Sequence, residues 1–74
     1  MEDYKMKHTT LANIKKGELF YTAKEFEKHG DNERWLRIKD DYDPSTKTWY
    51  CPRLTVDALG NGKYFKPDTE VVII

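Results

Sequence analysis

Cys51 is the single cysteine of the 74-residue chain, in the segment TWYCPRL, where two aromatic residues precede it and a proline follows. A nucleophilic cysteine needs a nearby base or cation that favours the thiolate. The candidates are His8, His29 and the adjacent Arg53, and the sequence forces none of these side chains against the thiol. Free cysteine is among the residue types that are most often buried. We therefore expect Cys51 to pack in the core.

Metal ligands are also sparse. Two histidines and one cysteine, each separated by about twenty residues, match no zinc signature. The segment DDYDPS begins like a calcium loop, with Asp41, Asp43 and Ser45 in alternate positions, but Thr46 stands where that loop needs glycine and Pro52 where it needs a bidentate acid. We interpret this segment as the solvated end of a hairpin and expect no metal site.

The run GNGK at residues 60–63 resembles a phosphate-binding loop only in part. Asp57 occupies the position of the first glycine of that motif, and Tyr64 the position of the metal-binding hydroxyl. A glycine pair in a turn is the simpler interpretation, so we expect no cofactor. Because no nucleophile, base and orienting group can be assembled, we also expect the protein not to be an enzyme.

One group of residues could bind a macromolecule. Trp35 and Tyr50 are interleaved with Arg37 and Lys39, and Arg53 follows closely. Aromatic rings between cations can stack bases and neutralise phosphates, which would suit single-stranded DNA or RNA. Alternatively, Trp35 packs beneath residues 23–33 or in a dimer interface, covered by arginine stems. Thirteen basic residues balance thirteen acidic ones, so we place a protein partner or self-association ahead of nucleic acid.

These five side chains are expected on a hairpin. Residues 34–39 alternate as a half-buried strand does, and Asp43–Thr46 favours a type I turn that leads back into TWYC. A four-residue loop there opposes Ile38 to Cys51, and directly opposed residues share a face. A slip of one residue would reverse the faces. This register buries Leu36, Ile38, Trp49 and Cys51, and it exposes Trp35, Arg37, Lys39 and Tyr50.

The remaining elements are short. Residues 1–8 are charged and aperiodic and are expected to form a flexible tail, and residues 9–74 a single domain. Leu11 and Ile14 ahead of Gly17 suit a short helical or tight turn, followed by a strand over 18–22. AKEFEK then either extends that strand or forms a brief helical turn, and the chain breaks at 29–33. The C-terminal half predicts a turn at 60–62, a strand over 63–66, a turn at 67–69 and a strand over 70–74.

Five short strands with turn signals between them predict an all-β fold, a small five-stranded SH3-like barrel or β-roll with at most one short helical turn. No apolar run approaches the roughly 20 residues that span a bilayer, and the N-terminus has no apolar signal-peptide region. The lone cysteine indicates no disulfide framework. We therefore expect a cytoplasmic protein with no membrane contact and no small-molecule substrate.

The chain resembles a recurring type of small protein of uncharacterised function from phages, prophages and their bacterial hosts. The resemblance covers most of residues 11–72 and rests on LANIKKGELF, a W-x-R strand, a Y-D-x-x-T-K hairpin, an aromatic residue two before a cysteine, and YFKPDTEVV. It implies a compact β-roll or SH3-like barrel and carries no catalytic residue over. The polar 23–33 connection and the charged tail depart from it. The structural positions that it implies are Leu11, Gly17, Phe20, Cys51, Phe65 and Val71.

Overall fold

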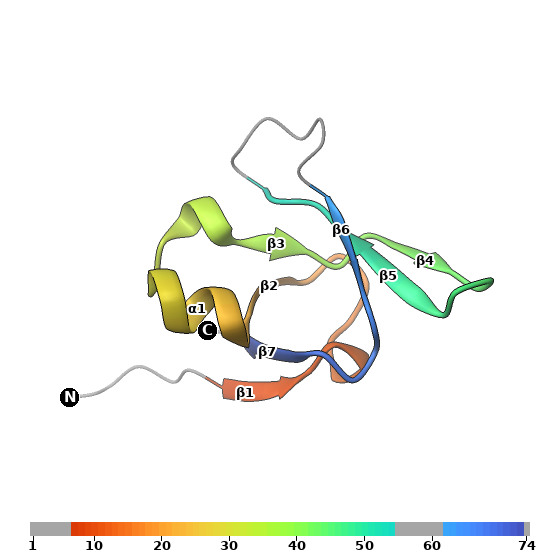
Figure 1. Cartoon of the computed structure of the whole chain (residues 1–74), viewed down its shortest axis with the longest axis horizontal. Helices are drawn as coiled ribbons and strands as arrows, with labels where there is room; N and C mark the ends of the chain where they lie inside the picture. Colours follow the sequence, from red (N-terminus) through yellow and green to blue (C-terminus); the bar gives the residue numbers. More distant parts are fainter. Residues whose placement is uncertain (1–6, 55–61, 74) are drawn as a thin grey trace.

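The computed structural model describes residues 7–54 and 62–73, and over this part of the chain it is mainly β, as expected (Figure 1). The strands form two antiparallel sheets, one in the order β1-β7-β2-β3 and the other in the order β4-β5-β6. The described part contains seven strands, where we expected five, and one short α-helix. The strands are β1 (Lys7–Thr10), β2 (Leu19–Thr22), β3 (Arg37–Ile38), β4 (Asp41–Asp43), β5 (Thr48–Cys51), β6 (Lys63–Phe65) and β7 (Glu70–Ile73), and the helix is α1 (Ala23–His29).

Strand β1 corrects the expected N-terminal tail. Lys7 and His8 are not part of a loose segment but form the first half of β1, which pairs with β7 from Lys7 opposite Ile73 to Thr10 opposite Glu70. The sequence gives little sign of this strand, because KHTT has no apolar residue and both Lys7 and His8 are exposed. The apolar strand β7 accounts for the presence of β1. Because β1 pairs with one edge of β7 and β2 with the other, β7 has no open edge at which another chain could associate.

The turn expected after residue 10 is a 3-10 helix at Leu11–Asn13. The backbone N–H of Leu11 donates to the carbonyl of Thr69 at 2.9 Å, which fastens this turn to the start of β7. Gly17 then adopts a positive φ of 93°, a conformation that L side chains rarely adopt. The expectation of a short helical turn closed by a glycine is confirmed.

Residues 23–28, which could have extended β2, instead begin a helix. The hydroxyl of Thr22 accepts a hydrogen bond from the backbone N–H of Glu25 (3.2 Å), so Thr22 is the N-cap of α1. Gly30 ends the helix with a φ of 70°. The hydroxyl of Tyr21 donates to Asp31 at 2.7 Å and fixes the return of the chain after α1. Burial and this contact with Asp31 raise the pKa of Tyr21 to about 12.

A β-bulge between β3 and β4 overturns the expected faces of the hairpin. Arg37 and Asp41 are four residues apart, but their partners across the ladder, Arg53 and Tyr50, are three residues apart. The extra residue lies next to Tyr50, whose carbonyl also accepts from the backbone N–H of Asp40 (3.2 Å). Every side chain before the bulge is therefore on the opposite face from the one that a continuous register would give it.

The strand expected over residues 34–39 is wrong for the most part, because Glu33–Trp35 forms a 3-10 helix and only Arg37–Ile38 is a strand. The hairpin forms, but its register differs from the expected one. Asp43 pairs with Thr48, so the loop consists of residues 44–47 rather than 43–46. Ile38 does not oppose Cys51; its backbone N–H donates to the carbonyl of Pro52 at 3.1 Å. As a consequence, Ile38 is only half-buried, and Arg37 and Lys39 take the buried positions.

The core lies between the two sheets and is small. Its buried members are Leu11, Ile14, Phe20, Cys51 and Val71, and Trp49, Phe65 and Ile73 pack against them. Strands β6 and β7 lie within the two segments expected at 63–66 and 70–74, and a turn at 67–68 joins them. Most of the turn expected at 60–62 is outside the described residues. None of the helices in the described ranges is long and apolar enough to cross a membrane.

Candidate functional site

The five residues expected to form one exposed face do not stay together. Arg37 and Lys39 are 1% and 4% exposed, so their expected exposure is wrong. Trp35 and Arg53 contact each other at the surface. Tyr50 neighbours Cys51 along β5 and therefore lies on the opposite face of the strand from that buried residue.

Arg37 is an internal cross-link. Its Nε and Nη2 donate to the two carboxylate oxygens of Glu25 at 3.0 and 2.9 Å, and its Nη1 donates to the carbonyl of Cys51 at 2.7 Å. Its guanidinium also lies over the ring of Phe65. Burial raises the pKa of Glu25, but the hydrogen bonds and charge of Arg37 outweigh it and hold that pKa below its usual range. Arg37 thus joins α1, β3, β5 and β6.

Lys39 is a second internal cross-link. Its Nζ donates to the carbonyl of Leu11 at 2.8 Å and to the carbonyl of Ile14, and it lies 4.3 Å from the centroid of the Trp49 ring. The Leu11 carbonyl also accepts the hydrogen bond of the 3-10 turn from the backbone N–H of Ile14 at 3.3 Å. Burial lowers the pKa of Lys39. The ammonium therefore holds the turn against the second sheet and is not available to a ligand.

Trp35 is also committed to internal contacts. The imidazole of His29 stacks on it, with centroids 4.1 Å apart and an interplanar angle of 4°. The guanidinium carbon of Arg53 lies 4.1 Å from the same indole centroid. His29 and Arg53 therefore both occupy ring surface of Trp35 that a stacking nucleic-acid base would need.

Cys51 is the core residue that the sequence predicts. It is fully buried, and its Sγ lies 3.6 Å from the carbonyl of Trp49. Burial raises the pKa of the Cys51 thiol to about 11, and the nearby cations Arg37 and Lys39 only partly oppose this. A buried thiol that stays protonated at neutral pH is a poor nucleophile.

The sheet β4-β5-β6 carries a different set of exposed side chains on the face turned away from the core. The register places Asp41 beside Tyr50 and Tyr50 beside Tyr64. The two tyrosine rings are 5.2 Å apart at 54°, and Tyr64 is 60% exposed. A shallow depression of about 310 Å³ lies here, and six residues line it: Asp41, Tyr42, Asp43, Pro44, Tyr50 and Tyr64. We call Asp41, Asp43, Tyr50 and Tyr64 the outer tyrosine face.

Two local features fix the geometry of the outer tyrosine face. Asp43 Oδ1 accepts from both the backbone N–H and the hydroxyl of Ser45, at 3.0 and 2.7 Å, and these hydrogen bonds lower the pKa of Asp43. Gly62 has no side chain where the ring of Tyr50 packs: a Cβ there would be 2.0 Å from that ring. The face is therefore supported by the hairpin loop at one end and by close backbone contact at the other.

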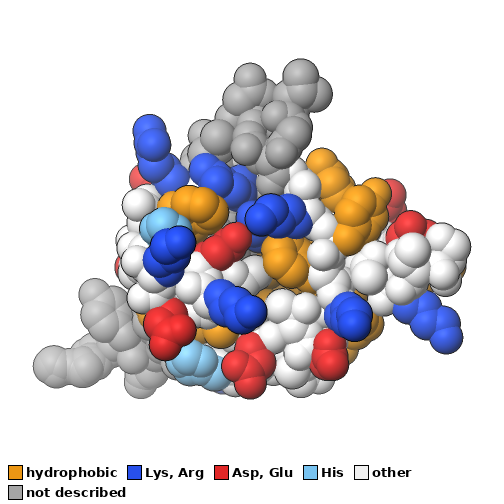
Figure 2. All heavy atoms as spheres, viewed as in Figure 1, with side chains coloured by type: hydrophobic (Ala, Val, Ile, Leu, Met, Phe, Trp, Pro, Cys, Tyr) orange, Lys and Arg blue, Asp and Glu red, His pale blue; other side chains and the backbone are white. Residues whose placement is uncertain are grey.

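Tyr64, Asp41 and Asp43 were absent from the face predicted from sequence. Alternation along KYF does place Tyr64 opposite to Lys63 and Phe65, so a signal was present. The pairing of β6 with β5 was the missing information. In the space-filling view, hydrophobic and acidic side chains lie towards the projecting β4-β5 end, which also carries a Lys or Arg side chain, and charges of both signs are mixed over α1 (Figure 2).

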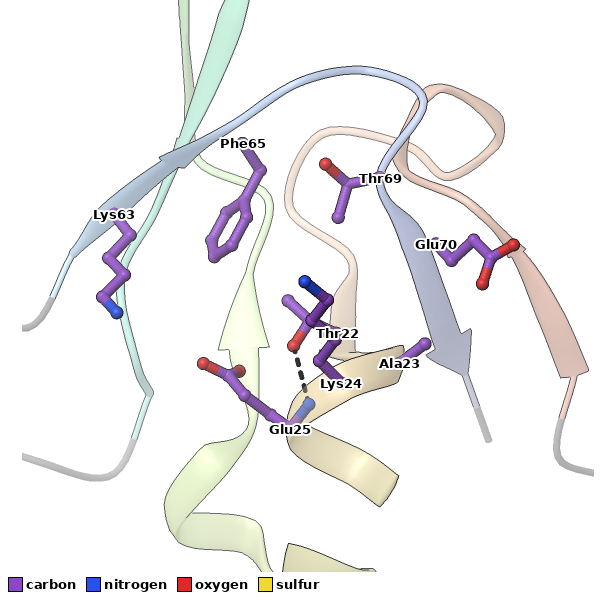
Figure 3. Close-up of a pocket in the computed structure, with 8 residues that line it drawn as sticks. All are labelled: Thr22, Ala23, Lys24, Glu25, Lys63, Phe65, Thr69 and Glu70. Atoms are coloured by element: carbon purple, nitrogen blue, oxygen red, sulfur yellow. Dashed lines mark hydrogen bonds between the residues drawn. The ribbon is translucent and has the colours of Figure 1, made fainter. Parts of the chain in front are cut away.

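A larger pocket of about 630 Å³ opens between α1 and the strands β6 and β7 (Figure 3). Phe65 points into it, and Lys63, Lys24 and Glu70 stand at its rim. Glu25 lines it too, but its two carboxylate oxygens are bound by Arg37. The rim thus mixes both charges. In residues 7–54 and 62–73, no group of three or more His, Cys, Asp or Glu side chains could hold a metal ion.

Comparisons of the chain with protein-family models, with curated proteins and with solved structures give no match.

Proposed function

We propose that the protein is a non-enzymatic protein-binding module and that the outer tyrosine face is its binding surface. The observation that carries this proposal is the exposure of Tyr64, 60%, next to Tyr50 and two aspartates on a sheet. Tyrosine is enriched in protein interfaces because it supplies a large, rigid contact area with few rotatable bonds. A paired strand holds these rings in place before a partner arrives, which lowers the entropic cost of binding.

Nucleic acid is the weaker alternative, although the aromatic and basic residues of 34–53 suggested it. Of the three cations in the face predicted from sequence, Arg37 and Lys39 are buried and hydrogen-bonded inside the protein, and Arg53 is stacked on Trp35. The chain as a whole has a formal net charge of zero. Affinity for nucleic acid depends chiefly on phosphate neutralisation by free cations, so the proposal favours a protein.

We propose a non-enzymatic protein because the side chains that could act as nucleophile or base are buried or stacked on other residues. The Cys51 thiol is buried, and His29 is stacked on Trp35. Nucleophilic catalysis needs a thiolate or hydroxyl with a base in reach. A reducing, cytoplasmic setting accords with one unpaired thiol.

The fold that we propose for this module is the SH3-like roll. The supporting feature is the strand order: β7, β2 and β3 lie together in one sheet and β4, β5 and β6 in the other, and β3 continues through the bulge into β4. Strand β1 and α1 are then additions to that roll. A phage or mobile-element origin is part of the same proposal and rests on the sequence resemblance alone.

Retention of partners by the immobilised protein tests the proposed function. A variant with Tyr50→Ala and Tyr64→Ala removes both rings, and Lys16→Ala is the control because Lys16 is exposed in a turn outside the face. We expect proteins that the wild type retains from the cells of origin to be retained by K16A and lost from the double variant. Retention that is equal in all three would contradict the proposal.

Two parallel measurements separate the alternatives. Sizing of the purified protein across concentration detects self-association, and the double variant should abolish it if a second copy is the partner. Fluorescence titration of the two tryptophans with a single-stranded oligonucleotide at low salt tests the nucleic-acid alternative. Salt-dependent oligonucleotide binding without any protein partner would replace the proposed function.

A further inference from the structure

We propose that the outer tyrosine face recognises an arginine side chain on an extended segment of the partner, with the guanidinium on the ring of Tyr64 and against the carboxylate of Asp41. This inference rests on the proposed function and names the chemistry of the partner. It commits to a peptide rather than to a nucleic acid.

Charge is the first argument. The six residues that line the depression include two aspartates and no lysine or arginine. Asp43 is bound by Ser45, but Asp41 is exposed and makes no ion pair or side-chain hydrogen bond in the described part of the chain. An uncompensated carboxylate beside exposed rings is complementary to a cation and repels phosphate.

Ring geometry is the second argument. Tyr50 and Tyr64 are tilted at 54° with centroids 5.2 Å apart, and Tyr64 leaves most of its surface uncovered. A guanidinium is planar and weakly hydrated, so it stacks on an aromatic ring while its N–H groups still reach a carboxylate. A lysine ammonium is compact and more strongly hydrated, and it has no planar group to lie flat on the ring, so it should gain less from the same two contacts.

Placement in the sheet is the third argument. Asp41 and Tyr64 flank Tyr50 on consecutive strands, so a side chain that crosses the strands meets all three residues in turn. The ring of Tyr50 packs against the backbone at Gly62, which supports it from one side. The same protein binds an internal arginine in a related way, since Arg37 contacts both Glu25 and the ring of Phe65.

Peptide affinity tests the inference directly. The probe is a blocked peptide of alternating arginine and glycine, compared with its lysine and citrulline counterparts by calorimetry at low ionic strength with the full-length protein. We expect the arginine peptide to bind about two- to fivefold more tightly than the lysine peptide, and the uncharged citrulline peptide to bind least. Citrulline keeps the planar group and removes its charge, so it separates stacking from attraction.

Matched variants locate the site. Asp41→Asn and Asp68→Asn each remove one exposed carboxylate, the first in the face and the second in the turn before β7. We expect D41N and Tyr64→Ala to weaken the arginine peptide about two- to fivefold, and D68N to leave its affinity unchanged. Both Asp41 and Tyr64 are exposed, so folding should survive, and a urea melt of each variant checks this.

Each remaining outcome overturns the inference. The inference is wrong if the arginine and lysine peptides bind with equal affinity and if D41N and D68N weaken that binding equally. Such a result would show general charge attraction only. Absence of arginine binding, or tighter binding of an oligonucleotide, would also refute it. If the partner is lost from Y64A while the arginine peptide fails to bind, the inference falls and the proposed function stands; if Y64A keeps its partner, the proposed function falls.

Discussion

Two buried cations are the central residues of this small core. Arg37 donates to the backbone carbonyl of Cys51, and Lys39 donates to those of Leu11 and Ile14. An unsatisfied buried carbonyl costs about 1–3 kcal/mol. In a 74-residue chain with few aliphatic residues, these long side chains supply both apolar stem and hydrogen bonds.

Substitution of Arg37 by Met should therefore be strongly destabilising. The change keeps an apolar stem but leaves the Cys51 carbonyl and the Glu25 carboxylate without their donor, so we expect the free energy of unfolding to fall by about 2–4 kcal/mol. Urea unfolding measures it. Arg34→Met, at an exposed position, is the control and should change stability by less than about 0.5 kcal/mol. Equal losses in the two variants would contradict the role of Arg37.

The lowered pKa of Glu25 predicts how the free energy of unfolding changes at acid pH. Its folded pKa is lower than that of an unfolded glutamate, about 4.3, so the unfolded chain binds more protons as the pH falls. The Glu25 contribution is complete above that pH and is lost as the pH falls through the folded pKa. Glu25→Gln should be less stable at neutral pH and should lose less stability on acidification. Parallel pH profiles of the wild type and E25Q would be the contrary result.

The thiol of Cys51 predicts the opposite trend at alkaline pH. Its folded pKa of about 11 lies above the roughly 8.5 of an unfolded cysteine, so the contribution is complete below about 8.5 and is lost as the pH rises towards 11. Cys51→Ala should flatten this alkaline loss. A thiol reagent should label native Cys51 only at the rate of protein opening, and rapid labelling without denaturant would argue against burial.

At the scale of the elements, α1 depends on a single cap. Thr22 is the N-cap, and Thr22→Ala removes the acceptor for the Glu25 N–H. We expect this change to cost about 1 kcal/mol, which is about 4–8 °C in Tm for a domain of this size. Thr22→Ser keeps the hydroxyl and should lose much less. If T22A and T22S melt together, the cap contributes nothing.

The elements also show how far sequence reasoning reaches. Hydrophobic type and turn residues located β2, the β4-β5 hairpin, β6 and β7, and burial of Cys51 followed from residue type. The exposed face could not be predicted in the same way. The bulge at Asp40 and Asp41 has no signal in the composition, yet it moves the side chains of Arg37 and Lys39 from the exposed face to the buried one. Strand β1 was missed because its polar residues are held by β7 and not by a pattern of their own.

Over the whole molecule, the formal net charge is zero, and Lys, Arg, Asp and Glu side chains are mixed over α1 in the view of Figure 2. The depression at the outer tyrosine face differs locally, because two aspartates and no lysine or arginine line it. The proposed partner would approach the projecting β4-β5 end, which carries the outer tyrosine face (Figure 1).

Photo-crosslinking from the outer tyrosine face tests the central claim most directly. Benzoylphenylalanine replaces Tyr64 in one preparation and Lys16 in the other, both at exposed positions, and each protein is irradiated in cells of origin. The account predicts a discrete protein adduct, identified by mass spectrometry, from position 64 and none from position 16. No adduct at position 64, or an adduct to RNA alone, would contradict it.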